Sequence, residues 1–432
     1  MNMMITVVGG CSDPTDTNCD ECCGGPVAKL PFGTGSYVSA VCWFTVRDLA
    51  DMLGGKVPVG GIDQSYGGTS IQFWMGASSI AESQAPVATQ CCGQNGGASC
   101  LYNTQIHPYT LGPMQFAAAL FYQGEQNANC GGPTQTANST YSTMLQAMVN
   151  EWRANLQQTN LVFGAVLLAP THRGDLYSFP LLRLAQVNLT SATSSAMANS
   201  FVVNNLDMGD YSNPEVHSPL KQADGLRAAL GIAALTKLVL TAQYLAPTYS
   251  GAKLDNASAS SSGGVGASGQ DVTVLFDKAT LYGGFVVNAS REACPPSLPV
   301  AQCEGFAVMT ADCTWHVVRA TVHNDSSTIT LSSSNAAGGG TSVYRLLYIY
   351  CLLMSNFDSI FIFILTEIIA TRGYFANWPL ASIFNAAGIP LNPWLAYVDD
   401  VSAADKAKCA LEPTIDYGET LQITEYAASY FR

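Results

Sequence analysis

The pattern of apolar and polar residues divides the chain into two parts of different character. In the first part, compact apolar runs predict β-strands, and they cover residues 4–8, 57–62, 114–121, 161–169 and 201–206. Between them, apolar residues three or four positions apart predict helices, and these cover residues 36–53, 141–157, 180–197 and 224–241. The alanines of 114–121 leave a helix open there. Strands that alternate with helices predict a three-layer α/β domain with a parallel sheet.

The second part alternates apolar and polar residues in short runs separated by turn residues, from 272 to 331. This pattern predicts an antiparallel β domain. A Ser/Gly/Ala-rich stretch at 257–269 before it is typical of a linker. We therefore expect four parts along the chain. They are a Cys/Gly-rich N-terminal remnant at 1–35, an α/β domain at 36–245, a linker at 246–270 and a smaller β-rich domain at 271–432.

Residues 344–370 form an apolar insertion that differs in composition from the Ser-, Gly- and Ala-rich sequence before it. As a helix the insertion would span about 40 Å, which is enough to cross a bilayer core of about 30 Å. However, Asn356, Asp358 and Glu367 interrupt it. We favour an intron that has been read into the protein. A membrane segment and a genuine buried insertion stay open as alternatives.

The overall composition limits the partners that the protein can have. The chain has 432 residues, of which 48% are hydrophobic and 11% charged, so it can bury a large core. Its formal net charge is −13. Nucleic acids and anionic membrane surfaces attract positively charged proteins, so this charge argues against both as partners.

The chain contains 14 cysteines, most of which gather in three groups. No histidine lies in or beside the first group, and no pair of CxxC knuckles recurs at zinc-finger spacing. These spacings favour disulfides over a metal site and leave the pairing open. The groups are Cys11, Cys19, Cys22 and Cys23, then Cys91, Cys92 and Cys100, and finally Cys294, Cys303 and Cys313.

Five N-x-S/T sequons fit the same cellular compartment as the disulfides. Both features belong to an oxidising secretory route, so we expect a secreted or lysosomal glycoprotein. The first ten residues carry no basic segment and only a short apolar run, so they are no signal peptide. We expect the natural start to lie upstream of Met1. The sequons lie at Asn138, Asn188, Asn256, Asn288 and Asn324.

The first candidate for chemistry is a group of polar residues directly after the predicted strand at 114–121. Gln123, Glu125 and Asn127 arrive together there, with Gly124 between the first two. Buried amides and carboxylates are costly to desolvate unless they bind something. In an open α/β sheet, ligands bind at the carboxyl ends of the strands. A polar turn without function is the alternative.

Two stretches in this region carry a resemblance to a known family. LYNTQIHPYT at 101–110 and FYQGEQNA at 121–128 resemble the "LYNxMIxPL … WYQGESNA" pair of the sialate O-acetylesterase family. Further stretches match in the right order. They are VSAVCWFTVRDL at 38–49, SYGGTSIQFWM at 65–75, LRLAQ at 182–186, the segment 207–227 and YFANWPLASIFNAAGIPLNPW at 374–394. The resemblance implies an SGNH-hydrolase fold and carbohydrate O-acetylesterase activity, and no metal or organic cofactor.

The resemblance also implies roles for individual residues. His217 stands where the family has its general base, and a positioned histidine titrates near working pH. Gly68 is the first candidate, and Gly67 the second, for a backbone N–H donor in the oxyanion hole. The Gln123 amide would be a further donor. Glu125 and Asn127 would support the loop around the site.

The third member of the catalytic triad stays open. Many SGNH enzymes have an aspartate three residues before the histidine, and here that position is Pro214. Glu215, Asp210 or a backbone carbonyl would orient His217 instead. A serine–histidine dyad supported by a carbonyl is a further alternative.

The nucleophile is the point at which the sequence departs from the family. The family's serine lies in a "GQSNM" block ahead of the helix predicted at 36–53, and we find no match to that block here. Ser12 follows a predicted strand, but its position and neighbours do not fit, and we do not assign it. We expect the nucleophile upstream of Met1 and little or no activity without it. The alternative is a non-catalytic carbohydrate-binding or structural glycoprotein.

Overall fold

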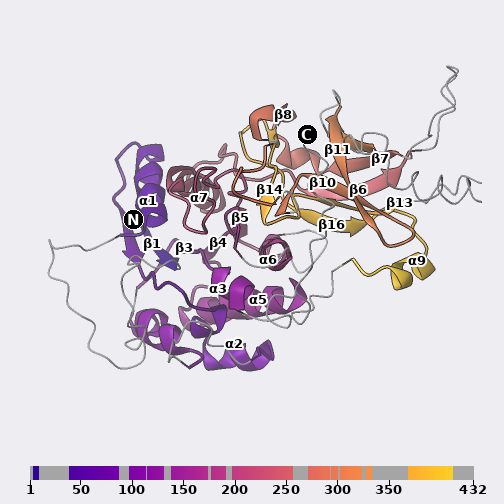
Figure 1. The fold of residues 1–432 in the computed structure, drawn as a ribbon. Coiled ribbons are helices and arrows are strands. Elements are labelled where there is room, and N and C mark those ends of the chain that lie inside the picture. The colour runs from indigo at the N-terminus through magenta and orange to yellow at the C-terminus, as the bar shows by residue number, and fades with distance from the viewer. Residues whose placement is uncertain are drawn as a thin grey trace, which may run out of the picture.

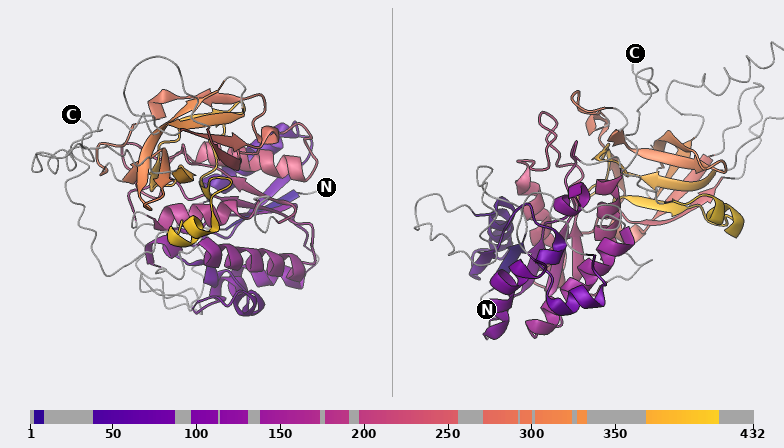
Figure 2. Two further views of the ribbon diagram at one scale, coloured as in Figure 1. Left: turned by 90° about the vertical axis from the view of Figure 1, so that its right-hand side faces the viewer. Right: turned by 60° about the horizontal axis from the view of Figure 1, so that its bottom comes forward.

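The computed structural model describes most of the chain. The described residues are 3–8, 38–86, 97–112, 114–130, 138–173, 177–190, 197–255, 271–291, 293–299, 302–323, 327–332 and 368–411. They form an α/β domain, drawn in indigo to magenta in Figures 1 and 2, and a β domain, drawn in orange to yellow, which lies against it. This arrangement confirms the predicted fold class.

The α/β domain is built on a five-stranded sheet whose order is β2-β1-β3-β4-β5. All neighbouring strands in it are parallel. The run at 114–121 thus contains a strand and not a helix. The strands are β1 (Met3–Val8), β2 (Val59–Asp63), β3 (Ala118–Phe121), β4 (Val162–Val166) and β5 (Ser200–Val203).

Helices cover both faces of this sheet (Figure 1). One core packs α1 and α7 against one face, and a second core packs α5 and α6 against the other. The helices are α1 (Ala40–Met52), α2 (Ala77–Glu82), α3 (Glu125–Cys130), α5 (Asn138–Asn155), α6 (Ser178–Val187) and α7 (Lys221–Leu235). Short helical turns lie at Ile71–Phe73, Tyr102–Ile106 and His107–Leu111.

Two of the predicted helices end well before the expected residue. The helix expected at 180–197 ends at Val187, where the Thr190 hydroxyl donates to the Val187 carbonyl. Hydroxyl side chains in this Ser/Thr-rich stretch compete for backbone hydrogen bonds. The helix expected at 224–241 is α7, which begins at Lys221 and ends at Leu235. Lys237 follows with φ +60°, a backbone conformation that an α-helix does not continue.

The β domain contains a seven-stranded antiparallel sheet whose order is β16-β13-β10-β11-β12-β7-β6. Two small pairs, β14–β9 and β15–β8, flank it. The first strands are β6 (Tyr249–Leu254), β7 (Asp271–Phe276), β8 (Phe285–Val287), β9 (Cys303–Glu304), β10 (Phe306–Thr310) and β11 (Trp315–Val322). They are followed by β12 (Thr328–Ser332), β13 (Ile368–Gly373), β14 (Trp378–Pro379), β15 (Ile383–Asn385) and β16 (Trp394–Tyr397). Helical turns lie at Lys278–Thr280 and Ala289–Arg291, and α9 spans Ala403–Lys408.

The expected linker at 246–270 and the apolar insertion at 344–370 both overlap strands of the β domain. Strand β6 lies inside the range 246–270 that we expected to be a linker, while residues 256–270 are outside the described residues. The apolar insertion at 344–370 ends inside β13, where Ile368, Ile369 and Ala370 are buried in the sheet. The rest of the insertion, 344–367, is outside the described residues.

Several of the cysteines are disulfide-bonded. Cys294 pairs with Cys303, and Cys313 pairs with Cys409. Cys100 is also disulfide-bonded. Cys42 is a buried free thiol, and burial together with the charge of Asp63 raises its pKa to about 12. The cysteines of the first group, Cys11 to Cys23, lie outside the described residues.

Buried polar side chains join the two domains. Arg183 on α6 is fully buried, and its guanidinium donates to the Leu168 carbonyl after β4 and to the Ala376 carbonyl of the β domain. Asn204 after β5 donates to the carbonyls of Pro390 and Leu391 at 3.1 and 3.0 Å. Residues 374–392, a family-like stretch, therefore lie against the carboxyl ends of β4 and β5.

Candidate functional site

The family-like loops gather at the carboxyl ends of the parallel strands. Val8, the last residue of β1, pairs with Phe121, the last residue of β3. The loop after β2 carries the two glycines, and Gln123 and Glu125 follow β3. The loop that carries His217 follows β5. Parallel strands end at one edge of a sheet, so these loops share one side of the domain.

Gln123 connects two of these loops through its buried amide. Its Nε2 donates to the Thr69 carbonyl at 2.9 Å and to Oδ1 of Asn127 at 2.8 Å. Its Oε1 accepts from the Tyr141 hydroxyl at 2.7 Å. Asn127 Oδ1 also accepts from the Ile71 N–H at 3.0 Å. Both N–H groups of the Gln123 amide are therefore bonded within the protein.

The two glycines differ in exposure. Gly67 is buried, whereas Gly68 is exposed and has φ +66°, a conformation that glycine adopts without strain. The Gly68 N–H makes no hydrogen bond to the described residues. Among the described residues, the Gly68 N–H therefore has no acceptor, and it lies on the loop that Gln123 holds through Thr69.

Glu125 begins α3 and is partly buried. Burial raises the pKa of its carboxyl group above the ordinary value, while a hydrogen bond from its own backbone N–H acts in the opposite direction. The charges of Lys221, His217 and Arg183 also lower this pKa. Glu125 therefore lies within electrostatic reach of His217.

His217 is exposed, and its ring makes no hydrogen bond to the described part of the chain. Glu215 binds elsewhere, because its Oε2 accepts from Arg173 Nε at 2.7 Å and its Oε1 lies 3.6 Å from His172 Nε2. The hydrogen bond from Arg173 is the main reason why the pKa of Glu215 is lowered, and the charge of His217 also lowers it. Asp210 accepts from the backbone and hydroxyl of Ser212.

Sequence reasoning missed a buried cluster beneath the His217 loop. Lys221 Nζ lies 3.0 Å from the Tyr122 hydroxyl, 4.5 Å from the centre of its ring and 3.8 Å from Asp224 Oδ2. Asp224 is fully buried, and neither of its carboxylate oxygens has a hydrogen-bond partner among the described residues. Burial raises its pKa to about 6, although Lys221 and Arg227 act in the opposite direction.

A second buried pair fixes the start of the same loop. Arg227 binds Asp207 through two hydrogen bonds of 2.6 and 2.9 Å, and its Nη1 also donates to the Asn204 carbonyl. Both side chains are nearly completely buried. The family-like segment 207–227 contains these residues, and that was the only sequence signal for them.

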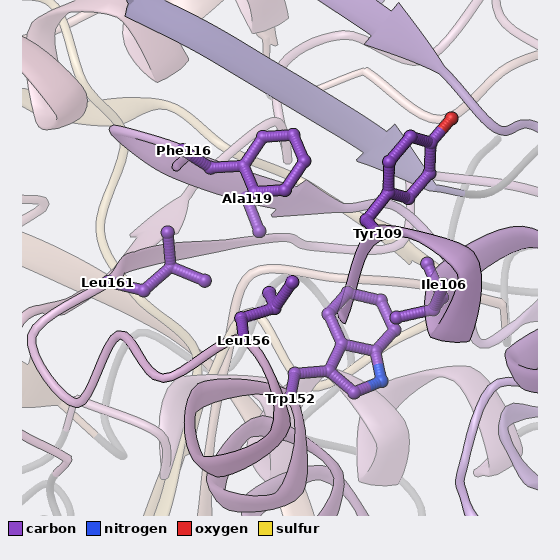
Figure 3. A pocket seen from close by; sticks show the side chains of 7 residues that line it. All are labelled: Ile106, Tyr109, Phe116, Ala119, Trp152, Leu156 and Leu161. Carbon is purple, nitrogen blue, oxygen red and sulfur yellow. The ribbon is translucent and has the colours of Figure 1, made fainter. Parts of the chain in front are cut away.

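The structure contains a small cavity and an open groove, and only the groove borders the His217 loop. Figure 3 shows a small apolar cavity of about 10 Å³ lined by residues such as Phe116 and Leu161, which precede β3 and β4. Phe116 and Leu161 place it towards the amino ends of β3 and β4, and Ile106 and Tyr109 of the family-like stretch 101–110 also line it. An open groove of about 590 Å³ borders the His217 loop at Met208 and Leu220, and Arg47 and Arg291 also line it.

The described residues contain no group of three or more side chains that would hold a metal ion. Within the same ranges, no helix is both long and apolar enough to cross a membrane. Of the sequons, Asn288 is exposed and Asn188 is half-buried at the end of α6. Asn256 and Asn324 lie outside the described residues.

Comparison with known proteins agrees with the motifs. Residues 34–221 match the family model described as "Carbohydrate esterase, sialic acid-specific acetylesterase". Sialate O-acetylesterase of Pongo abelii is 29% identical over 223 residues, and that of Homo sapiens is 28% identical over the same length. Each match covers 48% of this chain and 41% of the relative, so the chain matches less than half the length of these proteins.

Among solved structures, a carbohydrate acetylesterase from Xanthomonas citri is similar in fold. It has a TM-score of 0.57 and 21% sequence identity, and the match covers 82% of this chain and 65% of that one. At this identity the likeness concerns the fold alone. Residues 34–221 therefore form a domain of the sialic acid-specific acetylesterase family of carbohydrate esterases.

Proposed function

We propose that the protein is a carbohydrate O-acetylesterase that hydrolyses acetyl esters on sugars such as O-acetylated sialic acids by a serine–histidine mechanism. One observation carries the proposal: the loops with Gly68, Glu125 and His217, far apart in the sequence, all follow strands of one parallel sheet. In open α/β sheets this edge is where substrates bind. Family membership of residues 34–221 supports the same activity.

In this proposal His217 is the general base and Glu125 is the carboxylate that orients it. Glu125 follows β3 at the edge of the sheet that also carries the His217 loop, and the charge of His217 lowers its pKa. Glu215 is less suitable because Arg173 and His172 occupy its two oxygens. Asp210 is less suitable because Ser212 occupies its Oδ1. In this proposal Glu125 takes the role of the aspartate that many SGNH enzymes have three residues before the histidine, where this chain has Pro214.

The oxyanion hole in this proposal uses the N–H of Gly68, which has no acceptor in the part of the chain that the structure describes. The Gln123 amide would have to release Thr69 or Asn127 before it could donate to a substrate. We therefore propose that Gln123 mainly positions the glycine loop. An oxyanion-hole donor typically contributes about 10²–10³ in rate.

We propose Ser12 as the nucleophile in place of a serine upstream of Met1, and the position of β1 in the sheet supports this proposal. Sequence reasoning set Ser12 aside because its neighbours differ from the family block. In the structure, β1 lies between β2 and β3, and Val8 pairs with Phe121 at the edge that carries Glu125. Ser12 is four residues after Val8 in the sequence and itself lies outside the described residues. In the sequence, Ser12 is therefore the first serine after β1, the strand between β2 and β3.

The proposed reaction has two halves. The serine Oγ attacks the acetyl carbonyl while His217 takes its proton, and the developing oxyanion accepts a hydrogen bond from Gly68. The tetrahedral intermediate collapses, and the sugar oxygen leaves with the proton from His217. Water then attacks the acetyl-enzyme, with His217 as base again, and releases acetate and the free serine.

Acetate release by the full chain from O-acetylated N-acetylneuraminic acid tests this function. We expect turnover that Ser12→Ala and His217→Ala each reduce by at least about 10³-fold. A fluorophosphonate probe should label the peptide that contains Ser12. Turnover that survives Ser12→Ala would overturn the assignment of the nucleophile. Complete inactivity, with binding of the sugar retained, would favour the non-catalytic glycoprotein.

We also propose that the protein passes through the secretory pathway and carries N-glycans. The two disulfides Cys294–Cys303 and Cys313–Cys409 support an oxidising compartment. Asn288 is exposed and accessible to glycosylation. Treatment of the protein from secreting cells with an endoglycosidase should increase its mobility on a gel, and unchanged mobility would argue against the glycans.

A further inference from the structure

The loop that carries His217, residues 207–220, contacts the β domain at several points. At its start, Arg291 Nη1 donates to the Asp207 carbonyl at 2.6 Å. Further along, the Tyr211 hydroxyl donates to the Cys294 carbonyl at 3.0 Å. Arg291 and Cys294 lie on one short segment before β9. The β domain therefore holds the loop through both side-chain and backbone groups.

Trp378 of the β domain also packs against Gly209 of the loop. A Cβ built on Gly209 would lie only 2.5 Å from the Trp378 ring, so only a glycine lets the indole approach this closely. The φ of Gly209 is not positive, so the reason for glycine here is steric and not conformational. Trp378 is buried, with 6% of its surface exposed. Its indole therefore forms a rigid surface on which the loop rests.

A disulfide lies behind the indole. Trp378 packs in a small core with Leu298, Cys303 and Cys294, and the last two form a disulfide. Strand β14, which contains Trp378, pairs with β9 at Cys303. The disulfide thus joins the segment that accepts from Tyr211 to the strand that supports the indole.

Asn377, the residue before Trp378, binds a segment of the α/β domain that contacts the loop. The Asn377 carbonyl accepts from the Thr171 N–H at 3.1 Å, and Asn377 Nδ2 donates to the Arg173 carbonyl at 3.1 Å. Between these two residues, the His172 N–H donates to the Pro214 carbonyl at 2.8 Å. Asn377 therefore holds the segment 171–173, whose His172 is bonded to the loop at Pro214.

The hydrogen bonds between residues of the loop are local, and its other bonds run to Arg227, His172 and Arg173 of the α/β domain and to the β domain. Asp210 binds only the next residues, Ser212 and Asn213, and the Ser218 hydroxyl donates to the Met208 carbonyl at the base. No strand or helix lies between β5 and α7. Local turns fix the shape of a loop but not its position on the domain.

From these contacts we infer that Trp378, backed by the Cys294–Cys303 disulfide, is a positioning residue for His217. The inference rests on the proposed role of His217 as general base. The β domain would then take part in catalysis, because loss of the contact between Trp378 and Gly209 would shift the His217 imidazole. A shift of about 1 Å in a reacting group can reduce the rate about 10²-fold.

Two variants test the contact from its two sides. Trp378→Phe removes part of the indole and acts on the loop through this contact alone, whereas Gly209→Ala forces a methyl group against the indole and also to 2.8 Å from the Pro170 Cβ. Trp315→Phe is the matched control, since Trp315 is an aromatic residue of the same domain that packs on Arg372 and not on the loop. Far-UV circular dichroism and Tm show whether each full-length variant folds.

The first readout does not require activity. In the full chain, exchange of the His172 amide with solvent reports the loop through the bond to Pro214. We expect exchange at least about tenfold faster in Trp378→Phe and Gly209→Ala, and a changed ring resonance of His217 in NMR spectra of histidine-labelled protein. Trp315→Phe should change neither. Unchanged exchange and an unchanged His217 resonance in both folded variants would overturn the inference.

Kinetics separate this inference from the proposed function. We expect kcat for acetate release to fall about 10- to 100-fold in both variants, with KM within about threefold of the parent. Cys294→Ser with Cys303→Ser should act in the same direction. If the parent has no activity but the loop responds as described, the proposed function fails and the contact stands. Equal losses in Trp315→Phe would mean that the effect is a general loss of structure, which would overturn the positioning role.

Discussion

The side-chain amides of Gln123 and Asn127 are hydrogen-bonded to each other at 2.8 Å, and both are buried. Backbone groups fix the orientation of each amide, because Gln123 donates to the Thr69 carbonyl and Asn127 accepts from the Ile71 N–H. The polar residues after β3 therefore hold the glycine loop in place from inside the domain.

Asn127→Ala should destabilise the protein. The change leaves the Ile71 N–H and one N–H of Gln123 buried without an acceptor, and each such group costs about 1–3 kcal/mol. We expect a loss of about 2–5 kcal/mol in the free energy of unfolding, measured with urea. Asn103→Ala is the control, because Asn103 is exposed and should change stability by less than about 0.5 kcal/mol. Equal effects of the two changes would contradict the network.

The carboxylate that orients His217 can be identified by comparing Glu125→Gln with Glu215→Gln. Loss of the orienting charge should reduce kcat about 10²–10⁴-fold in Glu125→Gln. Glu215→Gln should change kcat less than about threefold, because Glu215 mainly binds Arg173. The measurement is acetate release at saturating substrate. The opposite order of effects would return the role to Glu215.

Asp224 should make stability fall as pH rises. Its pKa is 3.8 for a free side chain and about 6 in the folded protein, so the folded state binds the proton more tightly than the unfolded state. The stabilisation by this proton is complete below about pH 4 and is lost as pH rises to about 6, by up to about 3 kcal/mol. Urea unfolding between pH 4 and 7 should show this decline in the parent protein. Asp224→Asn should lack it, and an identical pH dependence in the two proteins would contradict the assignment.

Local sequence signals located most of the fold. The apolar run at 161–169 predicted a buried strand, and the structure has β4 there, at Val162–Val166, with every residue buried. The ends of helices were less predictable, because they depend on details such as the positive φ of Lys237. Thr45 interrupts the apolar stripe of α1, yet it is fully buried because its hydroxyl donates to the Val41 carbonyl at 2.7 Å.

The contacts between distant segments could not be read from the sequence. Arg183 lies in the family-like stretch LRLAQ, but nothing in that stretch indicates that it binds a carbonyl almost 200 residues away, that of Ala376. The approach of Trp378 to Gly209 is likewise a property of the folded chain. Motifs identify which residues belong to the site, whereas packing between the domains determines which of them touch.

Lys221→Met should raise the pKa of Glu125 further. Burial lowers the pKa of Lys221, but interactions with Tyr122, Asp224 and Glu125 outweigh this effect and raise it overall. The ammonium group therefore stays charged, and its charge opposes the effect of burial on Glu125. Without it, Glu125 accepts a proton at higher pH, and the acid limb of the kcat/KM profile should move to higher pH. The carboxyl carbon shift of Glu125, followed by NMR across the same pH range, reports the change without activity. Lys237→Met is the control, because Lys237 is exposed at the end of α7. A profile and a carboxyl shift that match the parent would show that Lys221 does not act on Glu125.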